Sequence, residues 1–224
     1  MAPKTIVFDL NETLLDLSAM DPVFQHLFGA AEVRKLWFGQ VLELFLTATV
    51  IDVYRPFGEL TDAALEMVAR QRGVRLDDAD RERVREALRA LPAYPDVRPA
   101  LERLEAAGLT LATLTNSGER SARQLLERNG LTALFDAVLS VDAVRRYKPA
   151  REAYEHAAKQ LDVQLGDIRL VAAHGWDVAG ALAAGCAAAF VERPEQAVDP
   201  PGERPDVVGR DLHDVAERIL ATHG

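Results

Sequence analysis

Apolar residues along the chain follow two different patterns. A short apolar run over residues 5–8 ends at Asp9 and predicts a buried strand. Between about residues 16 and 91 there is no convincing strand pattern. The apolar positions there recur at helical spacing, as in residues 33–45, and further helices are expected over residues 61–72 and 77–90. This part of the chain therefore predicts one strand followed by a block of about four helices.

Strand and helix patterns alternate in the rest of the chain, after Pro92 and Pro95. Strands are expected over residues 110–114, 137–140, 168–172 and 187–191. Helices are expected over residues 97–107, 119–129, 150–161 and 178–184, and a last helix begins near Asp211. Such alternation predicts βαβ units, whose parallel strands form a sheet with helices on both faces.

These patterns predict an α/β fold, a doubly wound parallel-sheet (Rossmann-like) core with an inserted all-helical cap. In this interpretation the core comprises residues 1–16 and 92–224, and the cap comprises residues 17–91. The 224 residues exceed the roughly 100–150 residues most common for one domain, yet they are too few for two full domains. One core that carries a smaller insertion fits this length.

Composition and charge narrow the classes of function. Hydrophobic residues make up 49% and charged residues 27%, as in an ordinary globular protein. The net charge of −9 argues against a nucleic-acid partner, because phosphate backbones are bound through clustered Lys and Arg. The single cysteine, Cys186, excludes a disulfide framework and a cysteine-type zinc site. Neither a secretory signal nor an apolar stretch of about 18 residues is evident, so we expect a cytoplasmic protein without a membrane partner.

Polar side chains follow the ends of four predicted strands. Asp9 follows the first strand, Thr115 and Asn116 follow the second, Lys148 lies in the loop after the third, and Asp177 follows the fourth. In doubly wound sheets, ligands bind beyond the carboxyl ends of the strands. The sequence therefore predicts a small-molecule site that combines two carboxylates, a hydroxyl, an amide and an ammonium group.

This set of groups suits covalent catalysis by a carboxylate. An ionised Asp9 can attack an electrophilic carbon or phosphorus and form an ester or acyl-phosphate, which water then hydrolyses. Lys148 supplies a positive charge that keeps Asp9 ionised, and Thr115 and Asn116 can orient it. Asp177 can bind a metal, pair with Lys148 or activate water.

Four short motifs at these strand ends resemble those of the haloacid-dehalogenase superfamily. Asp9 to Thr13 resembles the first motif, Asp-x-x-x-Thr after an apolar strand. Thr115-Asn116 resembles the second motif, Lys148 with its neighbours the third, and residues 171–177 the fourth. The motifs occur in the expected order, and the resemblance covers the whole chain. It implies a hydrolase whose nucleophile is Asp9.

Within the superfamily the sequence most resembles the L-2-haloacid dehalogenase (type II) branch. The shared features are a helical cap inserted just after the first motif, a tyrosine (Tyr154) six residues after Lys148, and the pair Trp176-Asp177. The resemblance implies that Asp9 displaces halide from the carbon next to a carboxylate, with inversion and without a cofactor. It thus implies hydrolytic dehalogenation of a small 2-haloacid.

The resemblance also implies roles for the surrounding residues. Thr13 and Thr115 would orient the nucleophile, Lys148 and Tyr154 would lie beside it, and Asp177 would orient Lys148 or activate the hydrolytic water. Asn116 and Trp176 match positions that help to hold the leaving halide. The predicted catalytic residues are Asp9, Thr13, Thr115, Lys148 and Asp177, and the predicted substrate-binding residues are Asn11, Asn116, Tyr154, His174 and Trp176.

Two positions depart from the pattern of this branch. Counted from Trp37, the cap position expected to hold an arginine is Gly29. Arg34, Lys35 or Arg55 could substitute for that arginine, although none falls at the matching position. The fourth motif has Ala172-Ala173-His174 where a Ser-Ser-Asn type of sequence is expected. His174 would serve there as a hydrogen-bonding group or as a base near neutral pH. Glu12, in the turn after the nucleophile, is expected to face solvent or to cap a helix.

A Mg²⁺-dependent phosphatase acting on a small phosphoester is the alternative function. Such phosphatases place a second acid two residues after the nucleophile, where this chain has Asn11, and a carboxylate four residues before the last one, where it has Ala173. Asp9 and Asp177 would then be the metal ligands. We favour dehalogenation, which needs no metal, because both specialised acids are missing. An inactive binding module is a third hypothesis, and the apolar helices of the cap leave a homodimer open.

Overall fold

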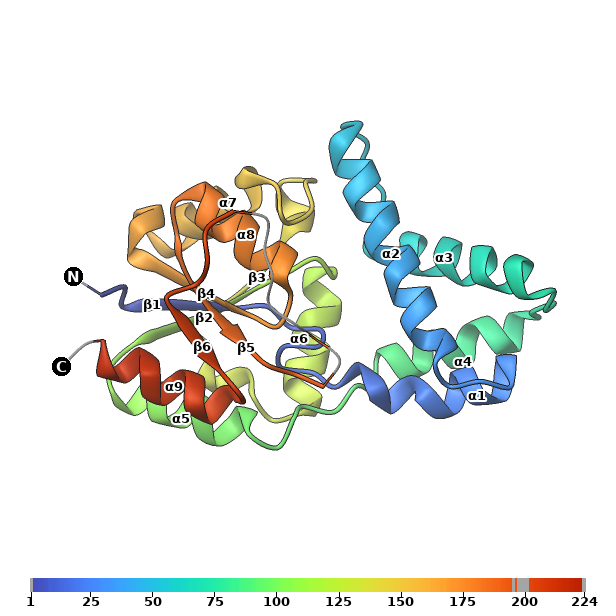
Figure 1. The fold of residues 1–224 in the computed structure, drawn as a ribbon, viewed down its shortest axis with the longest axis horizontal. Helices are drawn as coiled ribbons and strands as arrows, with labels where there is room; N and C mark the ends of the chain where they lie inside the picture. Colours follow the sequence, from blue (N-terminus) through green and yellow to red (C-terminus); the bar gives the residue numbers. More distant parts are fainter. Residues whose placement is uncertain (1, 195, 197–201, 223–224) are drawn as a thin grey trace.

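The computed structural model describes residues 2–194, 196 and 202–222, and a parallel sheet forms its centre (Figure 1). Within these residues the sheet has six strands in the order β3-β2-β1-β4-β5-β6. The strands are β1 (Thr5–Phe8), β2 (Thr110–Thr115), β3 (Ala137–Ser140), β4 (Ile168–Ala172), β5 (Ala187–Val191) and β6 (Val207–Gly209). The predicted α/β fold class is confirmed. The sequence did not reveal β6, because its three residues are too few to show a strand pattern.

Helices cover both faces of this sheet. On one face α5 (Val97–Ala106) packs against α9 (Leu212–Ala221), and on the other α7 (Arg151–Leu161) packs against α8 (Gly175–Ala184) (Figure 1). A further helix, α6 (Glu119–Arg128), contacts β3. The strands are buried on both faces as a result, which explains why their sequences are almost continuously apolar.

The direction in which the strands are added reverses at β1. The chain first adds β2 and β3 on one side of β1, and then adds β4, β5 and β6 on the other. The loops that follow β1 and β4 therefore diverge and leave a crevice at their carboxyl ends. Asp9 begins the first of these loops, and Ala173 begins the second.

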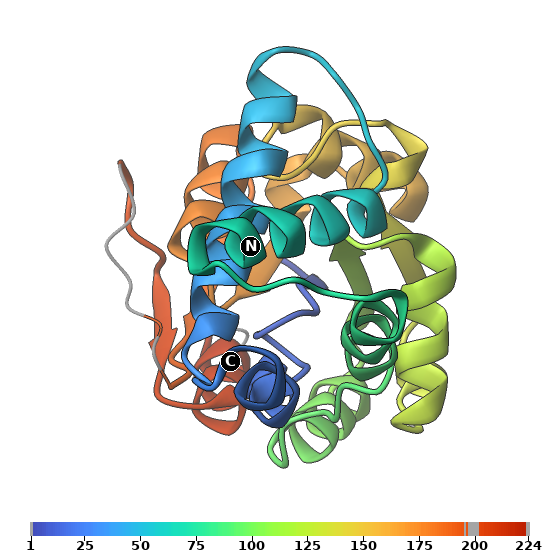
Figure 2. The same ribbon diagram turned by 90° about the vertical axis from the view of Figure 1, so that its right-hand side faces the viewer.

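Four helices lie beyond the carboxyl ends of the strands (Figures 1 and 2). They are α1 (Asp21–Phe28), α2 (Val33–Val50), α3 (Phe57–Arg72) and α4 (Asp78–Leu88). α2 packs along α3 and buries apolar residues at every fourth position from Val33 through Trp37 and Val41 to Phe45, so one stripe of the helix faces inward. α4 starts at a capping box in which Asp77 and Asp80 satisfy each other's backbone N–H groups.

The two connections between these helices and the sheet run side by side. The backbone N–H of Asp16 donates to the carbonyl of Pro92 at 2.8 Å. Arg193, from the loop after β5, holds both connections, because its guanidinium donates to the carbonyl of Thr13 at 2.8 and 3.1 Å and to the carboxylate of Asp96 at 2.7 Å. The loop that carries the nucleophile is therefore fixed to the return connection.

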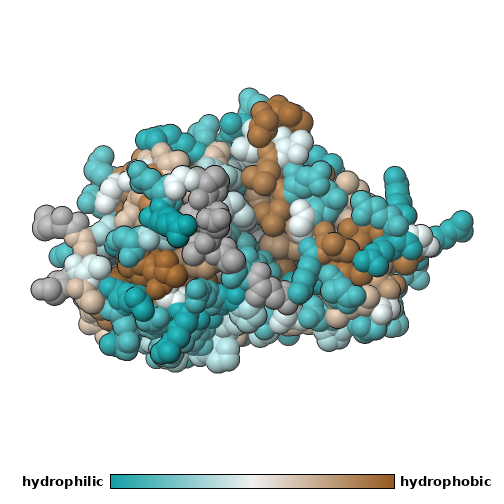
Figure 3. Space-filling model, viewed as in Figure 1, coloured by the Kyte–Doolittle hydropathy of each residue, from teal (hydrophilic) through white to brown (hydrophobic). Residues whose placement is uncertain are grey.

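The outer end of α2 carries an exposed apolar patch. Val50, Ile51 and Val53 are all exposed there, and Figure 3 shows the corresponding hydrophobic surface at the end of the helix. In the described part of the chain, no helix combines the length and the apolar character needed to cross a membrane.

Candidate active site

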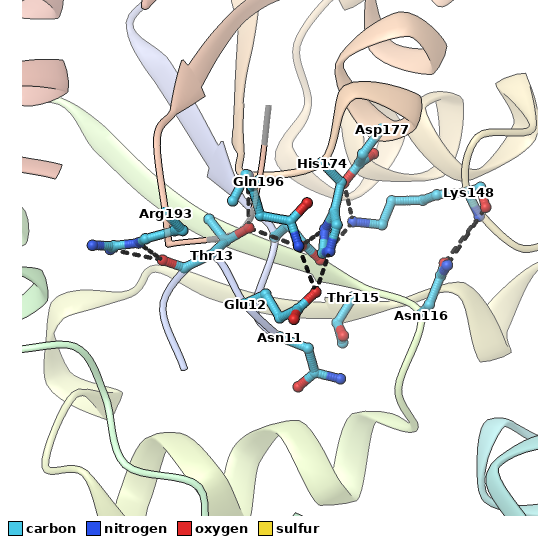
Figure 4. A network of polar contacts seen from close by, with 12 residues as sticks. Asn11, Glu12, Thr13, Thr115, Asn116, Lys148, His174, Asp177, Arg193 and Gln196 are labelled. Carbon is cyan, nitrogen blue, oxygen red and sulfur yellow. Dashed lines mark hydrogen bonds and ion pairs between the residues drawn. The ribbon is translucent and has the colours of Figure 1, made fainter. Parts of the chain in front are cut away.

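Four loops at the carboxyl ends of the strands bring the predicted polar residues together (Figure 4). Asp9 follows β1, and Thr115 ends β2. Lys148 lies just before α7, and Asp177 lies in the first turn of α8. The structure therefore places side chains from distant parts of the sequence around a single carboxylate, that of Asp9.

Lys148 lies between two carboxylates. Its ammonium nitrogen Nζ is 2.9 Å from Oδ1 of Asp9 and 2.6 Å from Oδ2 of Asp177, and its side chain is fully buried. Burial alone would raise the pKa of Asp9, but Lys148 and the hydrogen bond from His174 lower that pKa far below its ordinary value. Asp9 is therefore ionised at neutral pH, as a nucleophile must be.

Tyr154 holds the other carboxylate in place. Its hydroxyl donates to Oδ1 of Asp177 at 2.7 Å, while Oδ2 of Asp177 accepts from Lys148. A close approach of α8 to the loop before α7 makes this contact possible. A methyl group at Gly180 would collide with Pro149 and with the Tyr154 hydroxyl, so this position requires glycine.

Thr13 orients the second oxygen of the nucleophile. Its hydroxyl donates to Oδ2 of Asp9 at 2.8 Å and accepts from the backbone N–H of Ala173 at 3.0 Å. This hydroxyl therefore joins the loop after β1 to the loop after β4. Because both contacts involve buried groups, the rotamer of Asp9 is fixed relative to the sheet.

His174 bridges the nucleophile and a third carboxylate. Its Nδ1 is 3.2 Å from Oδ2 of Asp9, and its Nε2 is 2.9 Å from Oε2 of Glu12. A carboxylate oxygen only accepts hydrogen bonds, so both ring nitrogens carry protons and the ring is an imidazolium. Burial opposes the charge, but hydrogen bonds to Asp9 and Glu12 raise the pKa of His174 to about 9.

Glu12 corrects an expectation from the sequence. It does not face solvent, because its side chain is only 12% exposed. It accepts hydrogen bonds from His174 and from the amide of Gln196 at 3.0 Å, and it forms an ion pair with Arg34 at 3.6 Å. Its backbone is left-handed, with φ of 60°, and this turns the side chain back toward the site. The only indication in the sequence that Glu12 faces inward is His174, because a buried histidine that carries a charge needs a carboxylate beside it.

Thr115 and Asn116, which were also expected at the site, form hydrogen bonds mainly with backbone groups. The hydroxyl of Thr115 accepts from the N–H of Ser117 at 3.0 Å, and the carbonyl oxygen of the Asn116 side chain accepts from the N–H of Lys148 at 2.9 Å. The Asn11 amide donates to the hydroxyl of Ser117 at 3.2 Å. Thr115 thus shapes the turn after β2, and Asn116 fixes the loop that carries Lys148.

A small cavity of about 20 Å³ adjoins the nucleophile. Three aromatic rings from the helical block, those of Phe38, Phe45 and Phe57, form its far wall, and Trp176 lies beside His174 with the two rings stacked 5.1 Å apart. The indole N–H of Trp176 is buried and has no hydrogen-bond partner among the described residues. The cavity therefore lies between an aromatic wall from the helical block and the polar side chains of the core, which are those of Asp9, Asn11, Thr115, Asn116 and His174.

Gly29 of the helical block lies away from the cavity beside Asp9. Gly29 ends α1 in a left-handed conformation, with φ of 72°, and is exposed. The residue of the block that reaches the cavity from the start of α2 is Phe38, next to Trp37. Gly29, the position at which an arginine was expected, does not line the cavity beside Asp9, because the chain turns at that glycine before α2 begins.

The donor set does not fit a magnesium ion. A metal held by Asp9 and Asp177 would have to lie between them, where the Lys148 ammonium donates to both. Mg²⁺ requires several oxygen ligands in near-octahedral geometry. Among the described residues, no three His, Cys, Asp or Glu side chains are grouped so that they could hold a metal.

Comparisons with known proteins agree with this geometry. A family model described as a haloacid dehalogenase-like hydrolase matches residues 3–185. (S)-2-haloacid dehalogenase 1 of Pseudomonas sp. (strain CBS-3) is 35% identical over 185 residues, which is 81% of each chain. The (S)-2-haloacid dehalogenase of Pseudomonas sp. (strain YL) is 31% identical over 223 residues, covering 99% of this chain and 96% of that protein. The solved L-2-haloacid dehalogenase of Xanthobacter autotrophicus with chloropropionic acid covalently bound superposes with a TM-score of 0.90 at 27% identity, over 99% of this chain and all of that one.

Proposed function

This chain belongs to the haloacid dehalogenase-like hydrolase family, and from that premise we propose that it hydrolyses the carbon–halogen bond of a small 2-haloacid through an ester on Asp9. The four motifs correctly identified the family. The observation that carries the proposal is Lys148, whose ammonium lies between Asp9 and Asp177 where a phosphatase would need its metal. With Asn11 in place of the second acid, the site lacks the carboxylic acid that such phosphatases use to protonate a leaving alcohol.

The first step is substitution at the carbon that bears the halogen. A carboxylate oxygen of Asp9 forms a bond to that carbon, and the carbon–halogen bond breaks with its electron pair leaving on the halide. Lys148 and Thr13 aim the carboxylate, and the free indole N–H of Trp176 is the donor that the halide can use. No proton is transferred in this step, so no general acid is required.

The second step is attack of water on the carboxyl carbon of the Asp9 ester. Once the ester forms, Asp9 is no longer an anion, and His174 loses one of the two carboxylates that raise its pKa. His174 then releases a proton to solvent, and its neutral Nδ1 accepts a proton from the attacking water. The second proton of that water passes to the departing alkoxide oxygen as the ester bond breaks. Glu12 keeps Nε2 protonated and holds the ring. The products are the 2-hydroxyacid, halide and one proton, and the Asp9 carboxylate is restored beside an imidazolium.

Asp177 supports Lys148 in this scheme. Both of its oxygens are engaged, one by Lys148 and one by Tyr154, and its side chain is fully buried. Asp177 does not line the cavity beside Asp9, whereas His174 does. Of the two roles the sequence left open for Asp177, orientation of Lys148 is the one that these contacts favour.

The oligomeric state of the protein is a further part of the proposal. The exposed apolar patch formed by Val50, Ile51 and Val53 is a surface through which two copies could pair, and we propose a homodimer formed there. Sedimentation of the protein and of Ile51→Lys tests this, since a dimer formed through the patch would dissociate in the variant. The cytoplasmic location stays a prediction.

Ion release from the purified protein tests the catalytic proposal. Halide release from (S)-2-chloropropionate is expected with and without Mg²⁺, also after treatment with a chelator, and is expected to be lost in Asp9→Asn. Phosphate release from p-nitrophenyl phosphate that requires Mg²⁺, with no halide from any 2-haloacid, would instead establish the phosphatase alternative.

A further inference from the structure

A second, larger hollow adjoins the site. It has a volume of about 280 Å³ and lies between α3 and α4 of the helical block and α6 of the core. We call it the α4–α6 hollow. The cavity beside Asp9 is about 20 Å³, roughly the space of one water molecule, so a whole 2-haloacid cannot lie within it. The substrate must therefore extend into an adjoining space.

Two side chains separate the α4–α6 hollow from the nucleophile. Asn11 and Phe57 line both the hollow and the cavity beside Asp9. Asn11 is held on the core by its hydrogen bond to Ser117, whereas Phe57 is the first residue of α3. A change of the Phe57 rotamer is therefore the smallest movement that joins the two spaces.

The wall of the hollow suits an uncharged chain. Phe57, Leu88 and Leu125 supply its apolar surface. Its arginines are already paired, Arg85 with Asp62 at 2.7 Å and Arg89 with Glu82 at 2.8 Å. A carboxylate gains little from guanidinium groups that are already neutralised, while an alkyl chain gains from burial against the leucines.

The chemistry of the other side of the cavity differs. His174 and Trp176 border a second hollow of about 220 Å³, which is also lined by Glu12, Lys35 and Gln196. Phe38 and Leu42 also line this hollow, and its charged groups lie next to the proposed base. The two hollows thus differ in that the one at His174 has a charged histidine beside Asp9, whereas the arginines of the one at Phe57 are already paired.

We propose that the α4–α6 hollow receives the alkyl chain on C2 of the substrate, so that the enzyme acts on 2-haloalkanoic acids longer than three carbons. This inference rests on the proposed dehalogenase function. The carboxylate and halide stay beside His174 and Trp176, and the chain passes Phe57 into the hollow. The hollow then determines chain-length specificity without touching the reacting atoms.

A homologous series tests the inference. Halide release is measured with (S)-2-bromopropionate, (S)-2-bromobutyrate and (S)-2-bromohexanoate, so that the leaving group stays constant. Each added methylene is expected to raise kcat/KM about fourfold, which corresponds to about 0.8 kcal/mol per buried methylene. Ser121→Trp fills the hollow from an exposed position on α6, and Arg120→Trp adds the same ring to the neighbouring residue, which does not line the hollow.

The two variants are expected to differ in their effect on kcat/KM. Ser121→Trp should lower kcat/KM for bromohexanoate about tenfold or more and leave that for bromopropionate within about twofold, whereas Arg120→Trp should change neither. An unchanged ratio of kcat/KM for bromohexanoate over bromopropionate in Ser121→Trp, or a wild-type enzyme that processes bromopropionate and not bromohexanoate, would overturn the inference. Absence of halide from every acid, bromopropionate included, would instead remove the proposed function on which the inference rests.

Binding of carboxylic acids that cannot react tests the role of the hollow without any turnover. Hexanoate lacks a leaving group and is expected to bind the wild type more tightly than propionate does. Ser121→Trp should abolish that difference in calorimetric titration, with its thermal unfolding recorded to show that it is folded. The same preference for hexanoate in both proteins would contradict the assignment of the hollow.

Discussion

Replacing His174 by glutamine separates the two chemical steps. The amide of glutamine can hydrogen-bond, but it cannot accept a proton from water. Displacement of halide by Asp9 requires no proton transfer, so the first step should proceed. Hydrolysis of the ester should slow by about 10²–10⁴-fold, the usual contribution of a general base, which corresponds to about 3–5 kcal/mol in the barrier.

The geometry explains why the loss should fall on the second step alone. Nδ1 of His174 is 3.2 Å from Asp9, whereas Asp177, the other candidate base, is hydrogen-bonded to Lys148 and Tyr154 and does not line the cavity. Lys148 and Thr13 continue to hold the nucleophile in the variant. The ester should therefore accumulate.

Rapid mixing with (S)-2-chloropropionate measures the effect. A burst of about one halide per active site should precede a slow steady state, and intact-mass spectrometry should show the protein with the propionate substituent attached. Glu12→Gln serves as the matched variant, because it keeps a hydrogen-bond partner at Nε2 and removes the charge that holds that proton. Loss of the burst together with steady-state turnover, or turnover at the wild-type rate, would refute the assignment of His174.

Three further predictions concern stability. The pKa of His174 is raised from 6.5 to about 9, so its ionic contacts contribute about 3 kcal/mol to the free energy of unfolding. This contribution is fully present below pH 6.5 and is lost as the pH rises through 9. Denaturant unfolding of the wild type and of His174→Gln should therefore differ by about 3 kcal/mol at pH 6 and converge near pH 10. Lys148→Met leaves two buried carboxylates facing each other and should lower the free energy of unfolding by about 3–5 kcal/mol, with no loss refuting the buried ion pairs. Gly180→Ala should cost about 1–3 kcal/mol because its methyl group meets Pro149, whereas Gly166→Ala, with open space around it, should change the melting temperature little.

The sheet and the strand-end residues could be predicted because their signals are local. Each strand is a short apolar run followed by a polar turn, and parallel connectivity then places the turns at one edge. Asp9 stands immediately beyond such a run, and Lys148 and Asp177 lie in the segments that follow β3 and β4. Nothing in the pattern depends on side-chain conformation, so spacing alone was sufficient.

The cap-facing part of the site could not be predicted in the same way. Phe38 and Phe57 reach the cavity because of how α2 and α3 are placed over the sheet, and the sequence of an amphipathic helix does not specify that placement. Glu12 was misplaced because a left-handed backbone directs it inward, a conformation that non-glycine residues adopt only when their surroundings hold them there. What replaces the missing cap arginine could not be found by counting from Trp37, because a helix end at Gly29 lies between that position and α2.

Incorporation of oxygen from water tests the covalent mechanism most directly. The enzyme is incubated with excess (S)-2-chloropropionate in H₂¹⁸O, and peptides containing Asp9 are then examined by mass spectrometry. Attack of water on the carboxyl carbon of the ester predicts ¹⁸O in the Asp9 carboxylate, and a single turnover should give lactate without the label. Label in the lactate after one turnover, with Asp9 unlabelled, would contradict the account, because water would then have attacked the substrate directly.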